Sequence, residues 1–359
     1  MTSLLDRLGL EFPIIQAPMA GTSTPALAAA VSNAGGLGSI GLGAAGAERA
    51  RGMIDAIRQR TGRAFNVNLF CHQPATADPV KQAAWIDRLR PEFARYGAEP
   101  PATLSEIYTS FLVDQAMLAL LLESRPPVIS FHFGLPPAET LAALKATGAV
   151  LIASATSLAE GLAVQAAGCD AVVAQGWEAG GHRGAFDPDA PDDQLGTFAL
   201  TRLLVRALDI PVIAAGGIMD GAGVAAALAL GAIAAQLGTA FIACDESDAD
   251  EGHRAALAGE PAGHTVMTRA ISGRPARALA NRFTALGLEA GAAVPAYPIA
   301  YDAGKALNAA AKAKGDFGWG AQWAGQAAPL SRSMPAAELM ATLKGELAAA
   351  LKLSPPLRG

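Results

Sequence analysis

Short apolar runs recur along the first two thirds of the chain, and each is followed by an alanine-rich stretch of helical composition. Strands that alternate with helices in this way predict a parallel sheet, and eight repeats predict closure into a (β/α)8 TIM barrel. The length of 359 residues suits this fold, because α/β barrels exceed about 250 residues when they carry insertions. The eight candidate strands are residues 13–19, 37–40, 64–69, 128–131, 149–154, 171–175, 211–215 and 234–237.

Two segments interrupt the regular spacing of these runs. Between residues 69 and 128 the chain holds prolines and two amphipathic stretches, so we expect an inserted helical segment at about 73–125. After residue 237 the chain continues for another third of its length through alanine-rich helical stretches. We therefore expect a barrel over residues 1–245 and a mostly helical C-terminal extension over residues 246–359. The extension is expected to form a lid or subdomain over the barrel mouth and to contribute to the pocket there.

Composition favours a deeply buried sheet in a soluble protein. Hydrophobic residues make up 52% of the chain and charged residues 16%. Residues 221–244 carry no charge and are long enough for a membrane span, but Gly231 and Gly238 interrupt the segment. We expect a buried helix leading into a buried strand. The N-terminus has charged residues among its leucines and no continuous apolar export segment, which indicates a cytoplasmic protein.

Charge and cysteine content point to small-molecule chemistry. The net charge of −5, without long runs of one sign, gives no basic surface for nucleic acid or for an anionic membrane. Cys71, Cys169 and Cys244 are odd in number and form no C-x-x-C motif, so we expect neither a disulfide framework nor a metal site. This cysteine content fits a reducing cytoplasm.

Two overlapping glycine patterns match the G-x-G-x-x-G fingerprint of dinucleotide-binding sites, at residues 36–41 and 41–46. That fingerprint requires a strand before it and a helix after it. Here a helical stretch, residues 25–33, comes before it. The glycines are therefore expected to end this helix and to begin the second strand.

Ligand contacts in such barrels come from residues that follow the strands, because the active sites lie at the carboxyl ends of the strands. Gly216-Gly217 follows the seventh run, and Gly238-Thr239 follows the eighth. Glycines at these positions expose backbone N–H groups, and barrels often bind phosphate there. Two glycine turns are the alternative, but their coincidence at both strand ends favours a phosphate site.

The loop after the sixth run, residues 175–184, is polar and rich in glycine, and it contains His182. Such a loop allows the backbone to approach a flat ligand while it presents the histidine as an acid or base. A lone histidine is more often a surface or core residue. Glu178 and Arg183 in the same loop could stabilise it, and we leave both of them unassigned.

Other side chains with suitable chemistry lie near predicted strand ends or in the two added segments. His132 ends the fourth run, where a satisfied core histidine is the alternative, and Asn68 lies near the end of the third. The Asn68 amide suits the edge of a heterocycle, although it could equally cap a turn. Tyr301 and Lys305 lie on one helix face. A solvated surface is the default for such a pair.

Four blocks of the sequence together resemble the nitronate monooxygenase family, in its bacterial class I branch. The blocks are residues 16–21 with 29–38, residues 130–136, residues 175–186, and residues 211–223 continuing into 236–241. The resemblance covers most of the chain, and the four blocks in order are far more specific than any one of them.

The resemblance implies an FMN-dependent enzyme that oxidises alkyl nitronates, notably propionate 3-nitronate, with O2 to a carbonyl product and nitrite. It implies a small anionic substrate, and it leaves a homodimer open. His182 matches the catalytic histidine; it would be a base for a neutral nitroalkane, and would orient a preformed nitronate. The implied substrate contacts are Tyr108, His132, Tyr297, Tyr301 and Lys305. The implied FMN contacts are Ala17, Pro18, Met19, Asn68, Gln175, Gly180, Gly181, Gly216, Gly217, Gln236, Leu237, Gly238 and Thr239.

Two other functions are compatible with the same barrel. Related flavoproteins reduce quinones or enoyl thioesters with NADH and share the glycine-histidine loop, whereas Tyr108 and the group formed by Tyr297, Tyr301 and Lys305 favour the nitronate branch. A barrel that binds a phosphate ligand without catalysis is the third hypothesis, because a fold by itself does not establish a function.

Overall fold

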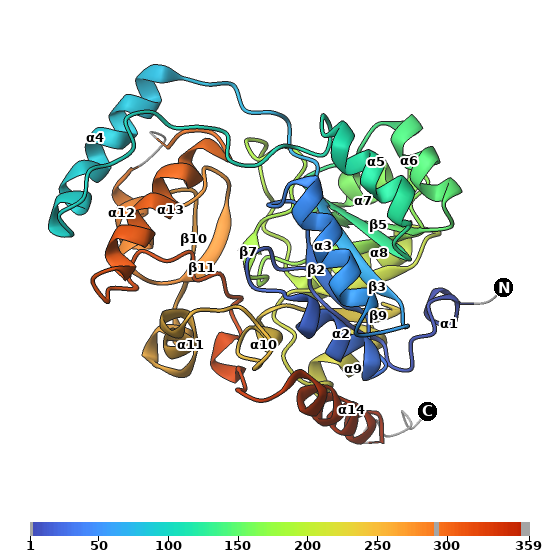
Figure 1. Cartoon of the computed structure of the whole chain (residues 1–359). Helices are drawn as coiled ribbons and strands as arrows, with labels where there is room; N and C mark the ends of the chain where they lie inside the picture. Colours follow the sequence, from blue (N-terminus) through green and yellow to red (C-terminus); the bar gives the residue numbers. More distant parts are fainter. Residues whose placement is uncertain (1–2, 291–293, 353–359) are drawn as a thin grey trace.

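Eight parallel strands form a barrel in the computed structural model, which describes residues 3–290 and 294–352 (Figure 1). The strands pair in the order β1-β9-β8-β6-β5-β4-β3-β2, and a parallel bridge from Ile15 to Leu37 joins β1 to β2. This confirms the predicted (β/α)8 barrel. The strands are β1 (Ile14–Gln16), β2 (Gly38–Gly41), β3 (Phe65–Phe70), β4 (Val128–His132), β5 (Val150–Ala155), β6 (Ala171–Gln175), β8 (Val212–Ala215) and β9 (Ala234–Leu237).

Each strand is apolar on both faces because both faces are covered. In β6, Val172 and Ala174 pack outward in the layer shared with the helices, whereas Ala171 and Val173 pack with residues at the starts of neighbouring strands. Leucines from the short helix α1 (Leu4–Arg7) and its flanks pack against this second group. The amino ends of the strands are thereby sealed, and the carboxyl ends form the open mouth.

Helices cover the outside of the barrel and include one from the far C-terminus. Helix α14 packs against α9 and α2, so the chain beyond residue 245 leaves the barrel and then returns to complete it (Figure 1). The division predicted at residue 245 assigned this helix to the C-terminal extension and not to the barrel. The barrel helices are α2 (Pro25–Asn33), α3 (Ala47–Arg58), α5 (Gln115–Ser124), α6 (Ala138–Ala146), α7 (Leu158–Ala166), α8 (Thr197–Ala207), α9 (Gly221–Ala229) and α14 (Ala336–Lys352).

A second unit, which we call the cap, joins the predicted insertion to the predicted extension. Trp85 and Phe93 of the insertion share one core with Phe283 and Leu307 of the extension. The cap lies beside the barrel in Figure 1 and contains a three-stranded antiparallel sheet, β10-β11-β7, that the sequence pattern did not predict. Its elements are α4 (Pro79–Arg95), β7 (Gly181–His182), α10 (Thr239–Ile242), α11 (Glu251–Ala258), η1 (Glu260–Gly263), β10 (Thr265–Thr268), β11 (Ala276–Leu279), α12 (Arg282–Ala290), α13 (Ile299–Lys312) and η3 (Ala328–Leu330).

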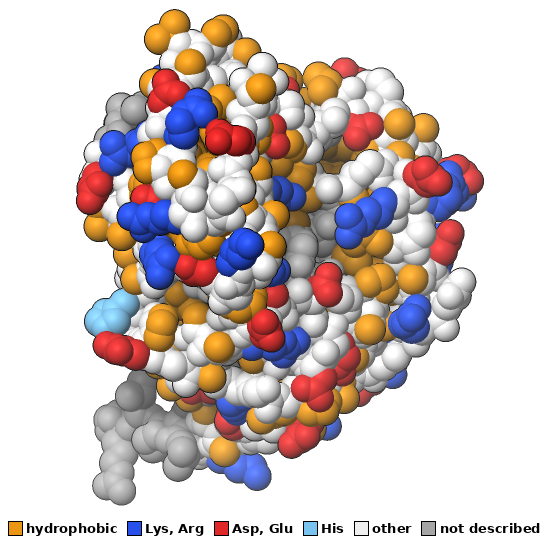
Figure 2. All heavy atoms as spheres, turned by 60° about the vertical axis from the view of Figure 1, so that its left-hand side comes forward, with side chains coloured by type: hydrophobic (Ala, Val, Ile, Leu, Met, Phe, Trp, Pro, Cys, Tyr) orange, Lys and Arg blue, Asp and Glu red, His pale blue; other side chains and the backbone are white. Residues whose placement is uncertain are grey.

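The uncharged segment at residues 221–244 forms helix α9 followed by strand β9, as expected. Across the described residues, every helix is too short or too polar to traverse a bilayer. Cys71, Cys169 and Cys244 are buried thiols. Charged side chains of both signs are interspersed over the face shown in Figure 2.

The glycine pattern at residues 36–41 has the structural role that the sequence predicted. Helix α2 ends at Asn33, and β2 begins at Gly38. A β-carbon at Gly38 would overlap the backbone carbonyl of Ala28 in α2, whereas one at Gly46 would meet nothing within 4 Å. Gly38 therefore allows the helix to lie directly against the barrel.

We predict that Gly38→Ala lowers the free energy of unfolding by about 2 kcal/mol, because the rigid backbone of α2 must move to admit the methyl group. Gly46→Ser serves as the matched control from the overlapping pattern. It should leave stability unchanged or slightly higher, since Gly46 precedes the first turn of α3 with an extended backbone, where serine is favoured. Urea unfolding of both variants checks the prediction; equal stabilities would contradict the packing role.

Candidate active site

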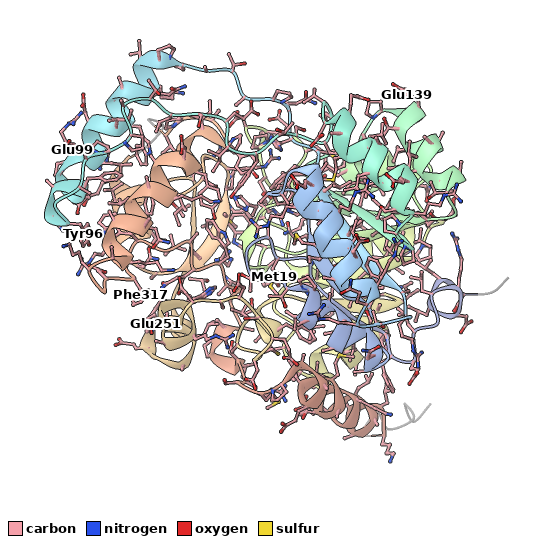
Figure 3. The ribbon with its side chains drawn as sticks, viewed as in Figure 1. Met19, Tyr96, Glu99, Glu139, Glu251 and Phe317 are labelled. Carbon is pink, nitrogen blue, oxygen red and sulfur yellow. The ribbon has the colours of Figure 1, made fainter. Side chains whose placement is uncertain are left out.

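A pocket opens where the carboxyl ends of the barrel strands meet the cap. Its empty volume is about 1360 Å³, which includes open solvent at its mouth. Met19, labelled near the centre of Figure 3, lies at this junction. The predicted site residues that line the pocket are Ala17, Pro18, Met19, Asn68, Tyr108, His132, Gln175, Gly180, Gly181, His182, Gly216, Gly217, Gln236, Gly238, Thr239, Tyr297 and Tyr301.

Two of the predicted site residues do not line the pocket. Leu237 is 1% exposed and packs outward with α9 and α14, because side chains alternate along a strand and its neighbour Gln236 takes the inward position. Lys305 is exposed and lies outside the wall formed by the tyrosines. Its ammonium nitrogen is 4.8 Å from the ring centre of Tyr108 and 5.4 Å from that of Tyr301.

The loop after β6 is held against both the barrel and the cap. Arg183 donates to the carbonyl oxygen of Gln175 at 2.6 Å and pairs with Asp192 at 2.7 Å, as expected for a loop stabiliser. A β-carbon at Gly180 would lie 2.5 Å from the backbone of Ala324 and Gly325. The glycine is therefore required for the close approach of this loop to the chain after the cap.

His182 lies in β7, whose antiparallel pairing with β11 fixes its backbone. Its carbonyl oxygen accepts hydrogen bonds from Gln175 Nε2 at 2.9 Å and from His132 Nε2 at 3.2 Å. Its ring nitrogen Nε2 is 2.9 Å from the hydroxyl of Ser272 in the turn before β11. The barrel and the cap thus both position this side chain.

His132 is hydrogen-bonded through both ring nitrogens. A carbonyl oxygen only accepts, so Nε2 carries the proton toward His182, and Nδ1 accepts from the Ser154 hydroxyl at 2.6 Å. Burial is the main cause that lowers the pKa of His132 to about 4. The imidazole is therefore neutral near pH 7, and its tautomer is fixed.

Burial also lowers the pKa of His182, to about 3, with further contributions from His132, Arg274 and His72. The ring is enclosed by aromatic neighbours, with centroid distances of 5.0 Å to Trp323 and 5.4 Å to Tyr297. A neutral imidazole in such surroundings is a weak base. It is better suited to donate a hydrogen bond to a bound anion.

Three tyrosines form the cap side of the pocket. Tyr108 comes from the insertion, Tyr297 precedes helix α13, and Tyr301 lies in that helix. The Tyr297 hydroxyl is buried and has no hydrogen-bond partner among the described residues. Burial is the first cause that raises the pKa of Tyr108, Tyr297 and Tyr301, the last to about 12. All three phenols are protonated near pH 7 and able to donate a hydrogen bond.

The glycines after β8 and β9 also line the pocket. Gly216 and Gly217 both have positive φ, at +119° and +69°. In the described part of the chain, the backbone N–H groups of Gly217 and Gly238 donate to no backbone or side-chain acceptor. The first turn of α10 begins directly after Gly238. This arrangement offers unpaired donors to a phosphate.

The structure also brings in residues that the sequence analysis missed: Ser154, Ser272, Arg274, Phe133 and Trp323. Phe133 lay inside one of the quoted sequence blocks, and Ser154 ends the fifth strand run, so both carried a signal that could have been used. Ser272, Arg274 and Trp323 come from irregular segments of the extension. Their placement depends on long-range pairing, which no local pattern reports.

An apolar pocket with a few convergent polar groups at the mouth of a (β/α)8 barrel defines a small-molecule enzyme site. The family model described as nitronate monooxygenase matches residues 2–346. The chain belongs to the nitronate monooxygenase family, a family of oxidoreductases.

The most informative relatives are similar to this chain over nearly its whole length. It is 66% identical over 96% of its length to a nitronate monooxygenase of Paraburkholderia phytofirmans, 94% of which is covered. It is 54% identical over 97% to one of Pseudomonas aeruginosa, 99% of which is covered. Among solved structures, a nitroalkane oxidase from Streptomyces ansochromogenes matches with a TM-score of 0.90, 43% identity, and coverage of 98% and 99%. FabK from Thermotoga maritima matches with a TM-score of 0.75, 31% identity, and coverage of 98% and 97%.

We predict that Ser272→Ala lowers the free energy of unfolding by about 1–2 kcal/mol, because it leaves a buried ring nitrogen of His182 without a partner. The ring ¹⁵N signals of His182 should change at the same time, since the hydroxyl no longer selects a tautomer. Ser331→Ala is the control: its buried hydroxyl has no partner among the described residues, and its loss should cost less than about 0.5 kcal/mol. Unchanged His182 signals would show that Ser272 does not orient the ring.

The four histidines His72, His132, His182 and His253 predict a marked loss of stability in mild acid. Their folded pKa values are lowered from 6.5 to between about 3 and about 4, mainly by burial. Below pH 6.5 the unfolded chain therefore binds more protons than the folded chain, and the free energy of unfolding falls with pH. Each histidine contributes up to about 1.4 kcal/mol per pH unit until its folded pKa is reached.

Urea unfolding between pH 7 and pH 4.5 measures this dependence. His72→Leu should make the pH dependence of stability shallower, because it removes one of the four histidines that titrate. The substitution breaks no hydrogen bond within the described residues, since neither ring nitrogen of His72 has a partner there. The same slope in the variant and in the wild type would refute a contribution from His72.

Proposed function

We propose that the protein binds FMN and oxidises alkyl nitronates, notably propionate 3-nitronate, with O2 to a carbonyl product and nitrite. The observation that carries this proposal is the chemistry of the pocket wall. Among the described lining residues there is no Asp or Glu, whereas neutral histidines, protonated phenols and backbone amides converge on the space. A nitronate is an anion, and a pocket of hydrogen-bond donors without carboxylates suits it.

The residues present fit FMN. Unpaired amides at Gly217 and Gly238, next to Thr239, suit the phosphate. Asn68 and Gln175 offer amide groups to the edge of the ring system, and the short chain from Ala17 to Met19 leaves an apolar surface beside it. When bound, FMN supplies an electron-accepting ring, which this chain's own side chains do not provide.

The polar side chains would bind and orient the substrate. We assign His182, backed by Ser272, to hold the nitronate oxygens by a hydrogen bond, with His132 keeping the His182 backbone in place. The buried hydroxyl of Tyr297 offers a second donor to the same anion. Aromatic rings around His182 exclude water, which strengthens both hydrogen bonds.

A preformed nitronate fits this site better than a neutral nitroalkane does. Removal of a carbon-bound proton requires a base, and a histidine whose pKa is about 3 is a poor one. The base role that the sequence left open for His182 is therefore the less favoured of the two. We propose that it acts chiefly as a donor to the anion.

The NADH-dependent reductase remains the second candidate function, because FabK has the same fold at a TM-score of 0.75. The tyrosine group from the cap favours the nitronate reaction. Tyr108 and Tyr301 have their ring centroids 5.9 Å apart, and Lys305 lies 4.8 Å from the ring centre of Tyr108. Phenols that donate hydrogen bonds beside a cation suit a small anion better than an uncharged thioester.

Steady-state assays test the proposed function. The purified, FMN-loaded protein should consume O2 and release nitrite with propionate 3-nitronate, and should be at least about tenfold slower with 3-nitropropionate, whose carbon is still protonated. No nitrite release from propionate 3-nitronate by a protein with full flavin content would contradict the proposal. Equal rates on both compounds would restore the base role of His182.

We predict that Lys305→Met raises the KM for propionate 3-nitronate by about fivefold, because an exposed charge contributes up to about 1 kcal/mol to an ion pair. The KM for ethyl nitronate, which has no carboxylate, should change less. Lys312→Met on the same helix is the control, since Lys312 pairs with Asp250 and does not approach the tyrosines. If Lys305→Met affects both substrates equally, Lys305 does not recognise the carboxylate.

A further inference from the structure

Three consecutive residues in the turn between β10 and β11 each support a different part of the pocket. Ser272 contacts the ring of His182. Gly273 has a φ of +93°, and a β-carbon there would lie 2.6 Å from the backbone nitrogen of Tyr297. Arg274 places its guanidinium 4.2 Å from the ring centre of Phe133. The turn is thus built against the pocket wall.

Arg274 is a buried cation without a carboxylate partner. The residue is 3% exposed, and within the described ranges it forms no ion pair within 4 Å. Its guanidinium donates to the carbonyl oxygens of Ala185 and Phe186, and its Nε atom has no partner there. A buried charge of this kind is costly unless an opposite charge approaches it.

The carboxylates nearest to Arg274 compensate it only in part. Burial is the main cause that lowers the pKa of Arg274 to about 10, and the charge of Arg269 lowers it further, whereas Tyr297, Glu160 and Asp187 act against the shift. Glu160 is itself engaged by the backbone and hydroxyl of Thr156 and by the amide of Phe186. The guanidinium therefore remains charged near pH 7.

Phe133 contacts both this cation and the two histidines that line the pocket. Its ring centre lies 4.5 Å from that of His132 and 5.6 Å from that of His182. Its backbone has a φ of +73°, an uncommon conformation for a bulky side chain, which the surrounding structure must hold in place. One aromatic ring is a thin layer of low dielectric, so the field of Arg274 reaches the histidines and the space beyond them.

We propose that Arg274 is a fixed positive charge behind the pocket that makes the site selective for an anionic substrate. The inference rests on the proposed nitronate oxidation and adds a specificity-determining residue that does not touch the substrate. The missing counter-charge of Arg274 is then supplied by the bound anion. The same field adds to the effect of burial, which is the main cause that lowers the pKa values of His132 and His182.

Calorimetric binding of nitrite to the FMN-loaded protein at pH 7 tests the inference directly. Arg274→Met keeps the apolar volume without the charge and should weaken nitrite binding on the order of tenfold, as expected for charges roughly 10 Å apart at an effective dielectric constant of about 20. Arg274→Lys keeps the charge and should stay within about threefold of the wild type. Arg269→Met, an exposed and paired arginine in the same connection, should bind nitrite as the wild type does.

A second readout separates the electrostatic role from a packing role. In Arg274→Met the NMR-detected pKa of His182 should rise, because a nearby positive charge has been removed, and Arg274→Lys should restore it. If Arg274→Met does not fold, Arg274→Gln replaces it, since it is also uncharged and keeps a hydrogen-bond donor at this position. Nitrite affinity and a His182 pKa equal to those of the wild type in the neutral variant would overturn the inference. Wild-type protein that binds nitrite but oxidises no nitronate would instead overturn the proposed function alone.

Discussion

Closure of eight parallel strands into a barrel is the constraint on which the rest of the structure depends. The leucines around α1 seal the amino ends of the strands, so the carboxyl ends are the open end of the barrel. Every strand then delivers its following residues to one small area. Asn68, His132, Gln175 and Gln236 come from four different strands and still line a single pocket. The cap covers this area with tyrosines and with the turn that supports His182.

The polar side chains of the pocket are neutral, and its two histidines are held by neighbouring residues. His132 and His182 are tied to Ser154, Ser272 and Gln175, and aromatic rings exclude water around them. Where the dielectric constant is low, the few remaining charges interact more strongly with other charges. The buried guanidinium of Arg274 is the clearest case, because no carboxylate among the described residues neutralises it at short range. Burial keeps the histidines neutral, and the field of Arg274 acts in the same direction.

Much of this structure follows from local sequence, and the remainder depends on distant pairing. All eight strand runs lie where the pattern of apolar residues predicted them, since burial on both faces leaves a strong signal. Gly216, Gly217 and Gly238 could be assigned to the site from the sequence, because glycines that follow barrel strands expose backbone N–H groups to a phosphate. Leu237 was assigned to the pocket although strand alternation turns it outward, and Lys305 lies outside the wall. Ser272 and Arg274 could not be predicted, because the short strands that position them carry no alternating pattern of their own.

We propose that this pocket accepts electrons from a small anion and not from a nicotinamide. Anaerobic mixing of the FMN-loaded protein with either propionate 3-nitronate or NADH, followed by visible absorption, distinguishes the two electron donors. We predict that the nitronate removes the absorption of the oxidised flavin within the time of a turnover and that NADH leaves it unchanged. Rapid bleaching by NADH, with no change on addition of the nitronate, would show instead that the protein is a nicotinamide-dependent reductase.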